Sequence, residues 1–82
     1  MRLDFGELLG EITEEIDRGN AKHGHGELAT PEQVALILLE ELGEFAQATM
    51  QQRPDDARKE LLQIAAVACN HLLGTGPHFS SQ

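Results

Sequence analysis

The stretch LILLEELGE, residues 36–44, places three glutamates in a run that is otherwise apolar apart from one glycine. Apolar residues around it recur at three- and four-residue spacings, which predicts a helix with one apolar side. That side is expected to contain Val34, Ile37, Leu38, Leu42, Phe45 and Ala48. Glu41 falls near its middle, and Glu44 projects from the same face. Because a carboxylate there is costly without a compensating positive charge, and the chain has few cations, the pattern indicates a bound divalent metal.

The size and composition of the chain favour a small helical domain that associates with copies of itself. Its 82 residues suffice for one domain, and aromatic residues make up only 4% of them, so large core anchors are scarce. We expect the domain to span residues 1–74, followed by a flexible tail over residues 75–82, which shows no periodicity. A central helix that is apolar nearly all round usually completes its core against another chain. We therefore expect a homodimer or a dimer of dimers.

Charge, cysteine content and hydropathy argue against several classes of protein. A net charge of −8 disfavours binding to a nucleic-acid backbone, which requires clustered Lys and Arg. The single cysteine, Cys69, rules out an intramolecular disulfide framework and fits a reducing compartment. No stretch reaches the roughly 18 apolar residues of a membrane span, and the N-terminus lacks the pattern of a secretory signal. We expect a cytoplasmic protein that binds neither nucleic acid nor membrane.

Periodicity divides the chain into three predicted helices. They are expected over Leu3–Asp17, from Pro31 to about Gln52, and from about Asp56 to Leu73. The fold class that follows is all-α, an antiparallel bundle of three main helices per chain that homo-oligomerisation completes.

Capping residues support these limits. Asp4 and Glu7 have the spacing of a reciprocal N-terminal pair, and Thr30 with Gln33 forms a capping box around Pro31. Gly74 is the expected C-terminal cap of the third helix.

A short turn over residues 51–56, in which Pro54 ends one helix and an aspartate caps the next, makes the second and third helices antiparallel neighbours. This geometry brings Glu60 toward Glu41 and Glu44. Without metal, carboxylates crowded in this way repel one another, so we expect at least one pKa to rise.

The segment RGNAKHGHGELA, residues 18–29, is predicted to break the helical chain, since it holds three glycines. Three interpretations remain open for it. It is a simple connector, it contacts substrate through Lys22 and its imidazoles, or His23 and His25 bind metal.

The acidic residues resemble the signature of the all-alpha nucleoside triphosphate pyrophosphohydrolases of the MazG type, ExxE followed after an insert by ExxD. Residues 41–44, ELGE, match the first half, and Glu60 opens a second half in which Gln63 stands in place of the aspartate. The KHG segment upstream and the run ELLQIAAVA, residues 60–68, are also similar to small MazG-like proteins. The resemblance covers roughly residues 8–73.

The resemblance implies hydrolysis of a nucleoside triphosphate between its α and β phosphates, giving a monophosphate and pyrophosphate. Glu41, Glu44 and Glu60 would hold Mg²⁺, with Mn²⁺ as the alternative ion, and Glu41 and Glu44 would be catalytic. Mg²⁺ prefers such hard oxygen ligands and bridges to substrate phosphates. The residues expected to contact substrate are Lys22, Gln63 and Asn70.

Two other interpretations compete with the enzyme. Because Gln63 contributes no charge, the chain is alternatively a catalytically weak or inactive nucleotide-binding regulatory module. In the second alternative, the chain is a structural helical protein whose glutamates are ordinary solvated residues. For Asn70, a place at a subunit interface is as well supported as a contact with substrate.

Overall fold

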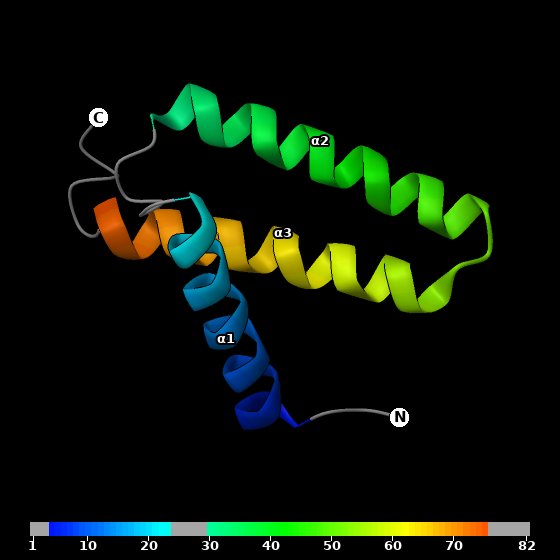
Figure 1. Ribbon diagram of the computed structural model, residues 1–82, viewed down its shortest axis with the longest axis horizontal. Coiled ribbons are helices and arrows are strands. Elements are labelled where there is room, and N and C mark those ends of the chain that lie inside the picture. The colour runs from blue at the N-terminus through cyan, green and yellow to red at the C-terminus, as the bar shows by residue number, and fades with distance from the viewer. Residues whose placement is uncertain (1–3, 24–29, 76–82) are drawn as a thin grey trace.

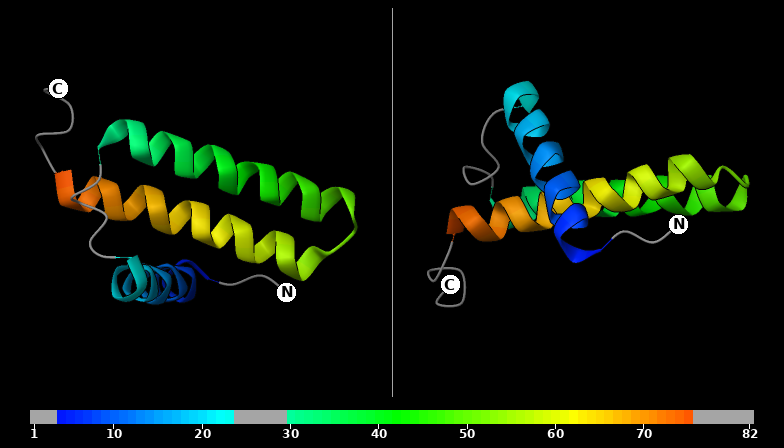
Figure 2. Two further views of the ribbon diagram at one scale, coloured as in Figure 1. Left: turned by 45° about the horizontal axis from the view of Figure 1, so that its top comes forward. Right: turned by 90° about the horizontal axis from the view of Figure 1, so that it is seen from below.

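The computed structural model describes residues 4–23 and 30–75, and within them the side chains of residues 4–19 and 30–74. This part of the chain is all-helical and contains no strand: α1 spans Phe5–His23, α2 Pro31–Met50 and α3 Pro54–Thr75. Helices α2 and α3 run antiparallel, and α1 lies across the other side of α3 (Figure 1 and Figure 2). Helix α3 is therefore the middle layer.

Two reciprocal caps fix the starts of α1 and α2, as the sequence predicts. The Glu7 N–H donates to Asp4 Oδ1 at 2.7 Å and the Asp4 N–H donates to Glu7 Oε1 at 3.2 Å. The Gln33 N–H donates to Thr30 Oγ1 at 3.2 Å, and the Thr30 N–H to Gln33 Oε1 at 2.9 Å. Each pair satisfies backbone donors that a helix start otherwise leaves open.

The predicted limits of the first helix and of the break after it are wrong. Helix α1 continues through Arg18 and Gly19 to His23, six residues beyond the predicted end at Asp17. One glycine costs a helix only about 1 kcal/mol. Good helix formers follow it at Ala21 and Lys22, and Arg18 forms an ion pair with Glu15 one turn earlier.

The turn between α2 and α3 is tighter than predicted. Helix α2 ends at Met50, and its carbonyls at Ala48 and Thr49 accept from the N–H groups of Arg53, at 2.9 Å, and Gln52, at 3.1 Å. This is a Schellman closure, in which Gln52 adopts the left-handed conformation (φ 58°) that glycine usually supplies.

Pro54 is the first residue of α3 and not the residue that ends α2, because a proline needs no N–H partner at a helix start. The aspartates expected to cap α3 lie inside its first turn, where Asp56 pairs with Arg53 at 2.6 Å. At its other end, α3 continues through the predicted cap Gly74 to Thr75.

The core of the described residues is thin. Its buried apolar side chains are Val34, Ala48 and Ala66, none of them large. Two members of the predicted apolar side of α2, Ile37 and Leu42, are 43% and 53% exposed, so that prediction was too wide. The radius of gyration, 13.5 Å, exceeds the roughly 12 Å expected of a compact chain of this length.

Helix α2 meets α3 along a single line of residues spaced four, three, four and three apart. The line begins and ends with a buried residue and has three half-buried residues between them: Val34, Leu38, Glu41, Phe45 and Ala48. Glu41 is therefore the middle member of the line that packs against α3. Across the described ranges, no helix combines the length and the apolar character that crossing a membrane requires.

Candidate metal centre

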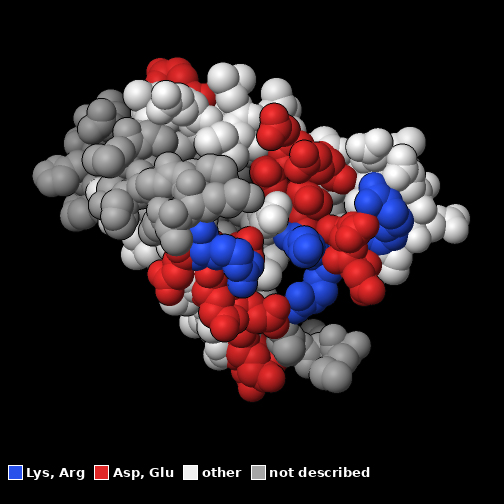
Figure 3. Space-filling view, in the orientation of Figure 1, with Lys and Arg blue, Asp and Glu red and all other residues white. Residues whose placement is uncertain are grey.

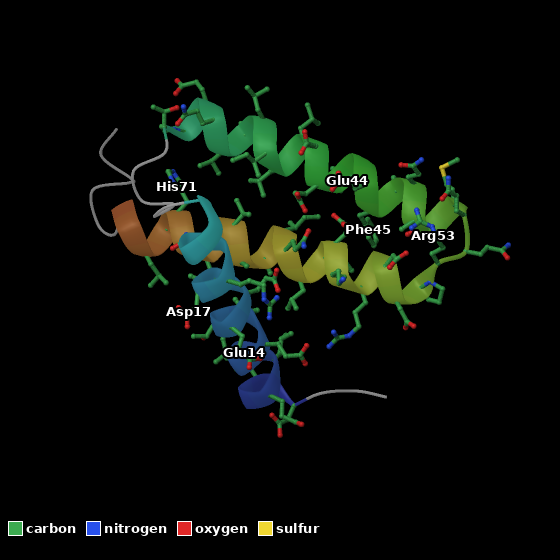
Figure 4. All side chains as sticks on the ribbon, in the orientation of Figure 1. Glu14, Asp17, Glu44, Phe45, Arg53 and His71 are labelled. Carbon is green, nitrogen blue, oxygen red and sulfur yellow. The ribbon has the colours of Figure 1, made fainter. Side chains whose placement is uncertain are left out.

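Three carboxylates from two helices converge between the middle of α2 and the first half of α3. Glu41 and Glu44 lie one turn apart on α2, and the antiparallel turn brings Glu60 of α3 opposite them. Each offers one oxygen, and these oxygens all lie within 4.8 Å of one another. We call these three residues the acidic triad. Figure 4 shows Glu44 and Phe45 in the middle of α2 and Arg53 at the turn beyond it.

Crowding and burial make all three carboxyl groups of the triad harder to ionise. Burial raises the pKa of Glu41, and the negative charges of Glu44, Glu40 and Glu15 raise it further. Burial also raises the pKa of Glu60, with Glu41 adding to the effect. The pKa of Glu44 rises chiefly because its protonated form is hydrogen-bonded to Glu60. The expected rise in pKa agrees with this geometry, and it extends to every member of the triad.

Two oxygens of the triad are buried without a hydrogen-bond partner among the described residues: Glu41 Oε2 and Glu60 Oε2. A buried acceptor without a donor costs about 1–3 kcal/mol, and more when it carries charge. A cation between the oxygens would remove that cost.

The arginines of the described ranges do not supply that cation. Arg58 on α3 donates to Glu11 on α1 through Nη1 at 3.1 Å and Nη2 at 3.2 Å. Arg18 pairs with Glu15, and Arg53 pairs with Asp56. In Figure 3 the basic side chains accordingly lie against acidic ones over α1, α3 and the turn.

The remaining predicted site residues lie at different distances from the triad. Gln63 is half-buried on α3, one turn after Glu60. Asn70 is half-buried ten residues after Glu60, about 15 Å along the helix axis. Gln63 therefore lies one helical turn from Glu60, and Asn70 lies further along α3. Lys22 and His23 belong to the last turn of α1, but their side chains lie outside the described residues, as does all of His25.

An open cavity of about 370 Å³ adjoins the triad on the side of the turn. It is lined by Phe45, Thr49, Gln52, Arg53, Pro54, Ala57, Arg58 and Leu61. No residue of the triad lines it, and the lining residues nearest to the triad in the chain are Phe45, after Glu44, and Leu61, after Glu60.

Three residues near the triad and the cavity are not predicted by any sequence pattern. Arg53 and Arg58 reach the cavity from the turn and from α3, and Glu15 comes close enough from α1 to affect Glu41. For Arg53, the one available signal was its place in the predicted turn between the two helices that carry the triad. No spacing pattern points to Glu15 or Arg58, because their positions depend on how α1 crosses α3.

Comparisons with protein-family models, with curated proteins and with solved structures found no match to this chain.

Proposed function

We propose that the chain is a Mg²⁺-dependent nucleoside triphosphate pyrophosphohydrolase, which cleaves an NTP or dNTP into a monophosphate and pyrophosphate. The observation that carries the proposal is the acidic triad, whose oxygens from two helices converge within 4.8 Å. The MazG-like spacing of its members supports the same reaction. The proposal includes a homodimer or dimer of dimers acting in the cytoplasm.

The triad fits a hard divalent cation. Glu41, Glu44 and Glu60 offer only oxygen donors, and two of these oxygens, on Glu41 and Glu60, are buried without a partner among the described residues. These three residues would hold Mg²⁺, with Mn²⁺ as the alternative. The ion they hold would supply positive charge to neutralise the phosphate oxygens of the substrate during in-line attack.

The substrate is expected to extend from the triad into the adjoining cavity. Phe45 offers an aromatic face for the base, and the cavity wall beside it is formed largely by apolar side chains. Arg58 and Arg53 line the same cavity, and their guanidinium groups pair with Glu11 and Asp56, so the proposal assigns neither of them a phosphate contact. Gln63 would orient water or a phosphate oxygen beside Glu60, while Asn70 and Lys22 would contact more distant parts of the nucleotide.

Glu41 and Glu44 differ in solvent exposure, and we assign them different roles on that basis. Glu41 is half-buried in the packing line and would bind the ion through a fixed carboxylate. Glu44 is exposed, and its pKa is raised, which suits a group that accepts a proton from the attacking water. The water oxygen would bond to phosphorus as the bond to the bridging oxygen between the α and β phosphates breaks, so that pyrophosphate leaves.

The test is pyrophosphate release from a panel of common NTPs and dNTPs, in Mg²⁺ and in EDTA. We expect metal-dependent release from at least one nucleotide, and its loss by 100-fold or more in Glu44→Gln. Glu40→Gln is the matched control, since it removes a neighbouring exposed charge from outside the triad. No release from any nucleotide by the folded, metal-loaded protein would refute the enzyme.

A regulatory nucleotide-binding module is the second candidate, and the observation that favours it is Gln63. The MazG-type signature has a carboxylate at this position, whereas this amide adds no charge to the triad. Binding of Mg²⁺ and of a nucleotide without release of pyrophosphate is the result expected of this module.

A further inference from the structure

Gln63 lies one helical turn after Glu60 on α3 and is half-buried. Residues three apart on a helix share a face, so positions 60 and 63 belong to the same side of α3. The MazG-type signature has a carboxylate at position 63, and this chain has a neutral amide there. The difference bears on how many ions the acidic triad can hold.

The oxygens of the acidic triad are spaced for one small cation. They all lie within 4.8 Å of one another. Mg²⁺ binds oxygen at about 2.1 Å, so two oxygens on opposite sides of one ion stand about 4.2 Å apart. The two ions of a binuclear site lie about 3.5–4 Å apart, and each of them needs oxygens besides those that the ions share. A single ion is therefore enough to engage one oxygen from each member of the triad.

The buried oxygens of the triad also favour one ion between the helices. Glu41 Oε2 on α2 and Glu60 Oε2 on α3 are buried without a hydrogen-bond partner among the described residues. Such acceptors are costly unless a donor or a cation compensates them. Because the two oxygens come from facing helices, one ion between α2 and α3 would compensate both.

The other carboxylates around the triad are already paired or lie outside the cluster. Glu15 and Asp56 add negative charge near the triad, but each forms an ion pair, with Arg18 and Arg53 respectively. Glu40 is exposed and is not part of the clustered carboxylates. Within the described ranges, no further Asp, Glu, His or Cys joins the triad as a possible ligand. A second ion would therefore depend on the residue at position 63.

The amide of Gln63 is a poor ligand for a second ion. It offers one neutral carbonyl oxygen, and its NH₂ group only donates hydrogen bonds. One divalent ion leaves the three carboxylates with a net negative charge, whereas a second ion would make the site positive. A carboxylate at this position would supply both the missing charge and two further oxygens.

We propose that the acidic triad holds one divalent ion per chain, and that Gln63 excludes the second ion that a carboxylate at position 63 would admit. The inference rests on the proposed function, which assigns the ion to the triad. A second ion then reaches the site only as part of a metal–nucleotide complex, bound to the phosphates of the substrate.

Titration of the whole chain with Mn²⁺, in the absence of nucleotide, tests the number of ions. Mn²⁺ takes the same oxygen ligands as Mg²⁺, and the electron paramagnetic resonance signal of the free ion gives the number bound. We expect one tightly bound ion per chain in the wild type and two in Gln63→Asp. Two ions about 3.5–4 Å apart are magnetically coupled, so the bound signal of Gln63→Asp should lose the pattern of an isolated ion.

Gln47→Asp is the matched control, because it adds the same charge on the exposed side of α2 and should still bind one ion. Two coupled ions in the wild type, no bound ion in the wild type, or a single ion in folded Gln63→Asp overturns the proposal. The count in the wild type does not depend on whether a variant folds.

The count of ions and the proposed hydrolase fail separately. One bound ion without pyrophosphate release from any nucleotide refutes the enzyme and leaves the count intact. Two coupled ions in a wild-type protein that releases pyrophosphate refutes the count and leaves the enzyme intact.

Discussion

Arg58 of α3 holds Glu11 of α1 through two parallel hydrogen bonds, at 3.1 Å and 3.2 Å, although the residues lie 47 positions apart in the chain. The pair raises the pKa of Arg58, chiefly through the hydrogen bonds to Glu11, so the guanidinium remains charged. Among the ion pairs of the described residues, this one joins two different helices, whereas those of Arg18 and Arg53 join residues three positions apart. It thus adds a polar link to the contact between α1 and α3.

We expect Arg58→Ala to lower the melting temperature by roughly 2–6 °C, because it removes a bidentate ion pair. Because that pair is partly exposed, salt screens it, so the melting temperature of the variant should also depend less on salt concentration. Thermal unfolding at low and high NaCl measures both effects. Arg53→Ala is the control, because its partner Asp56 lies in the same local turn. Equal effects in the two variants would mean that the contact between α1 and α3 does not depend on Arg58.

The apo protein should become more stable as pH falls from 7.5 toward 5. The folded-state pKa values of Glu41, Glu44 and Glu60 are raised above the ordinary value of 4.5. Between that value and the raised ones, the native state holds protons that the unfolded chain has released, so stability is lost as pH rises through this window. Melting in EDTA at constant ionic strength measures the trend, and Glu41→Gln should flatten it. A melting temperature that rises with pH in this window would contradict the crowded triad.

Mg²⁺ should stabilise the protein at pH 7.5, by about 2.7 kcal/mol at a concentration 100 times its dissociation constant. The effect should shrink at pH 5, where protons compete for the same oxygens. Glu41→Gln should abolish the response and leave the apo protein as stable or more stable, because it removes a crowded charge. Glu14→Gln, on the exposed surface of α1, should respond like wild type. A severe loss of apo stability in Glu41→Gln would instead mark Glu41 as a structural residue.

Gln63→Asp should tighten Mg²⁺ binding about tenfold or more, since it adds a fourth carboxylate one turn from Glu60. Calorimetric titration measures the change. Gln47→Asp adds the same charge on the exposed side of α2 and should leave the affinity nearly unchanged. Weaker binding in Gln63→Asp would mean that the amide itself is the preferred group at the centre.

Gln52→Gly should stabilise the chain by about 1 kcal/mol, because glycine adopts the left-handed conformation without the penalty that a side chain carries. Gln51→Gly should destabilise the chain. Gln51 has an ordinary negative φ of −87°, so glycine relieves no strain there and only increases the conformational entropy of the unfolded chain. Urea unfolding of both variants measures the contrast. The same sign of change in both would refute the assignment of strain to Gln52.

The predictions that succeeded concern residues close together in the chain. Thr30 with Gln33, and Asp4 with Glu7, act across three positions, so their hydrogen bonds follow from residue type and spacing. The meeting of Glu60 with Glu41 follows from a short turn between two long helices.

The features that escaped prediction depend on balances of small energies or on the docking of α1. Helix α1 passes through Gly19 because the cost of one glycine is small beside the gain from its neighbours. The left-handed conformation of Gln52 is set by the geometry of the whole turn. From residue preferences alone, that conformation would have been expected at a glycine. The approach of Glu15 to Glu41 requires knowledge of how α1 crosses α3, and no periodicity encodes that crossing.

The middle position of α3 divides the molecule into parts of unequal importance for the site. Every oxygen of the triad is carried by one continuous hairpin, residues 31–75, whereas α1 contacts chiefly α3 from the far side. A fluctuation that detaches α1 therefore leaves the donor set assembled and removes the negative charge of Glu15 from its neighbourhood. Local opening of the first helix would thus change the negative charge around the triad while leaving in place the three carboxylates proposed to bind Mg²⁺.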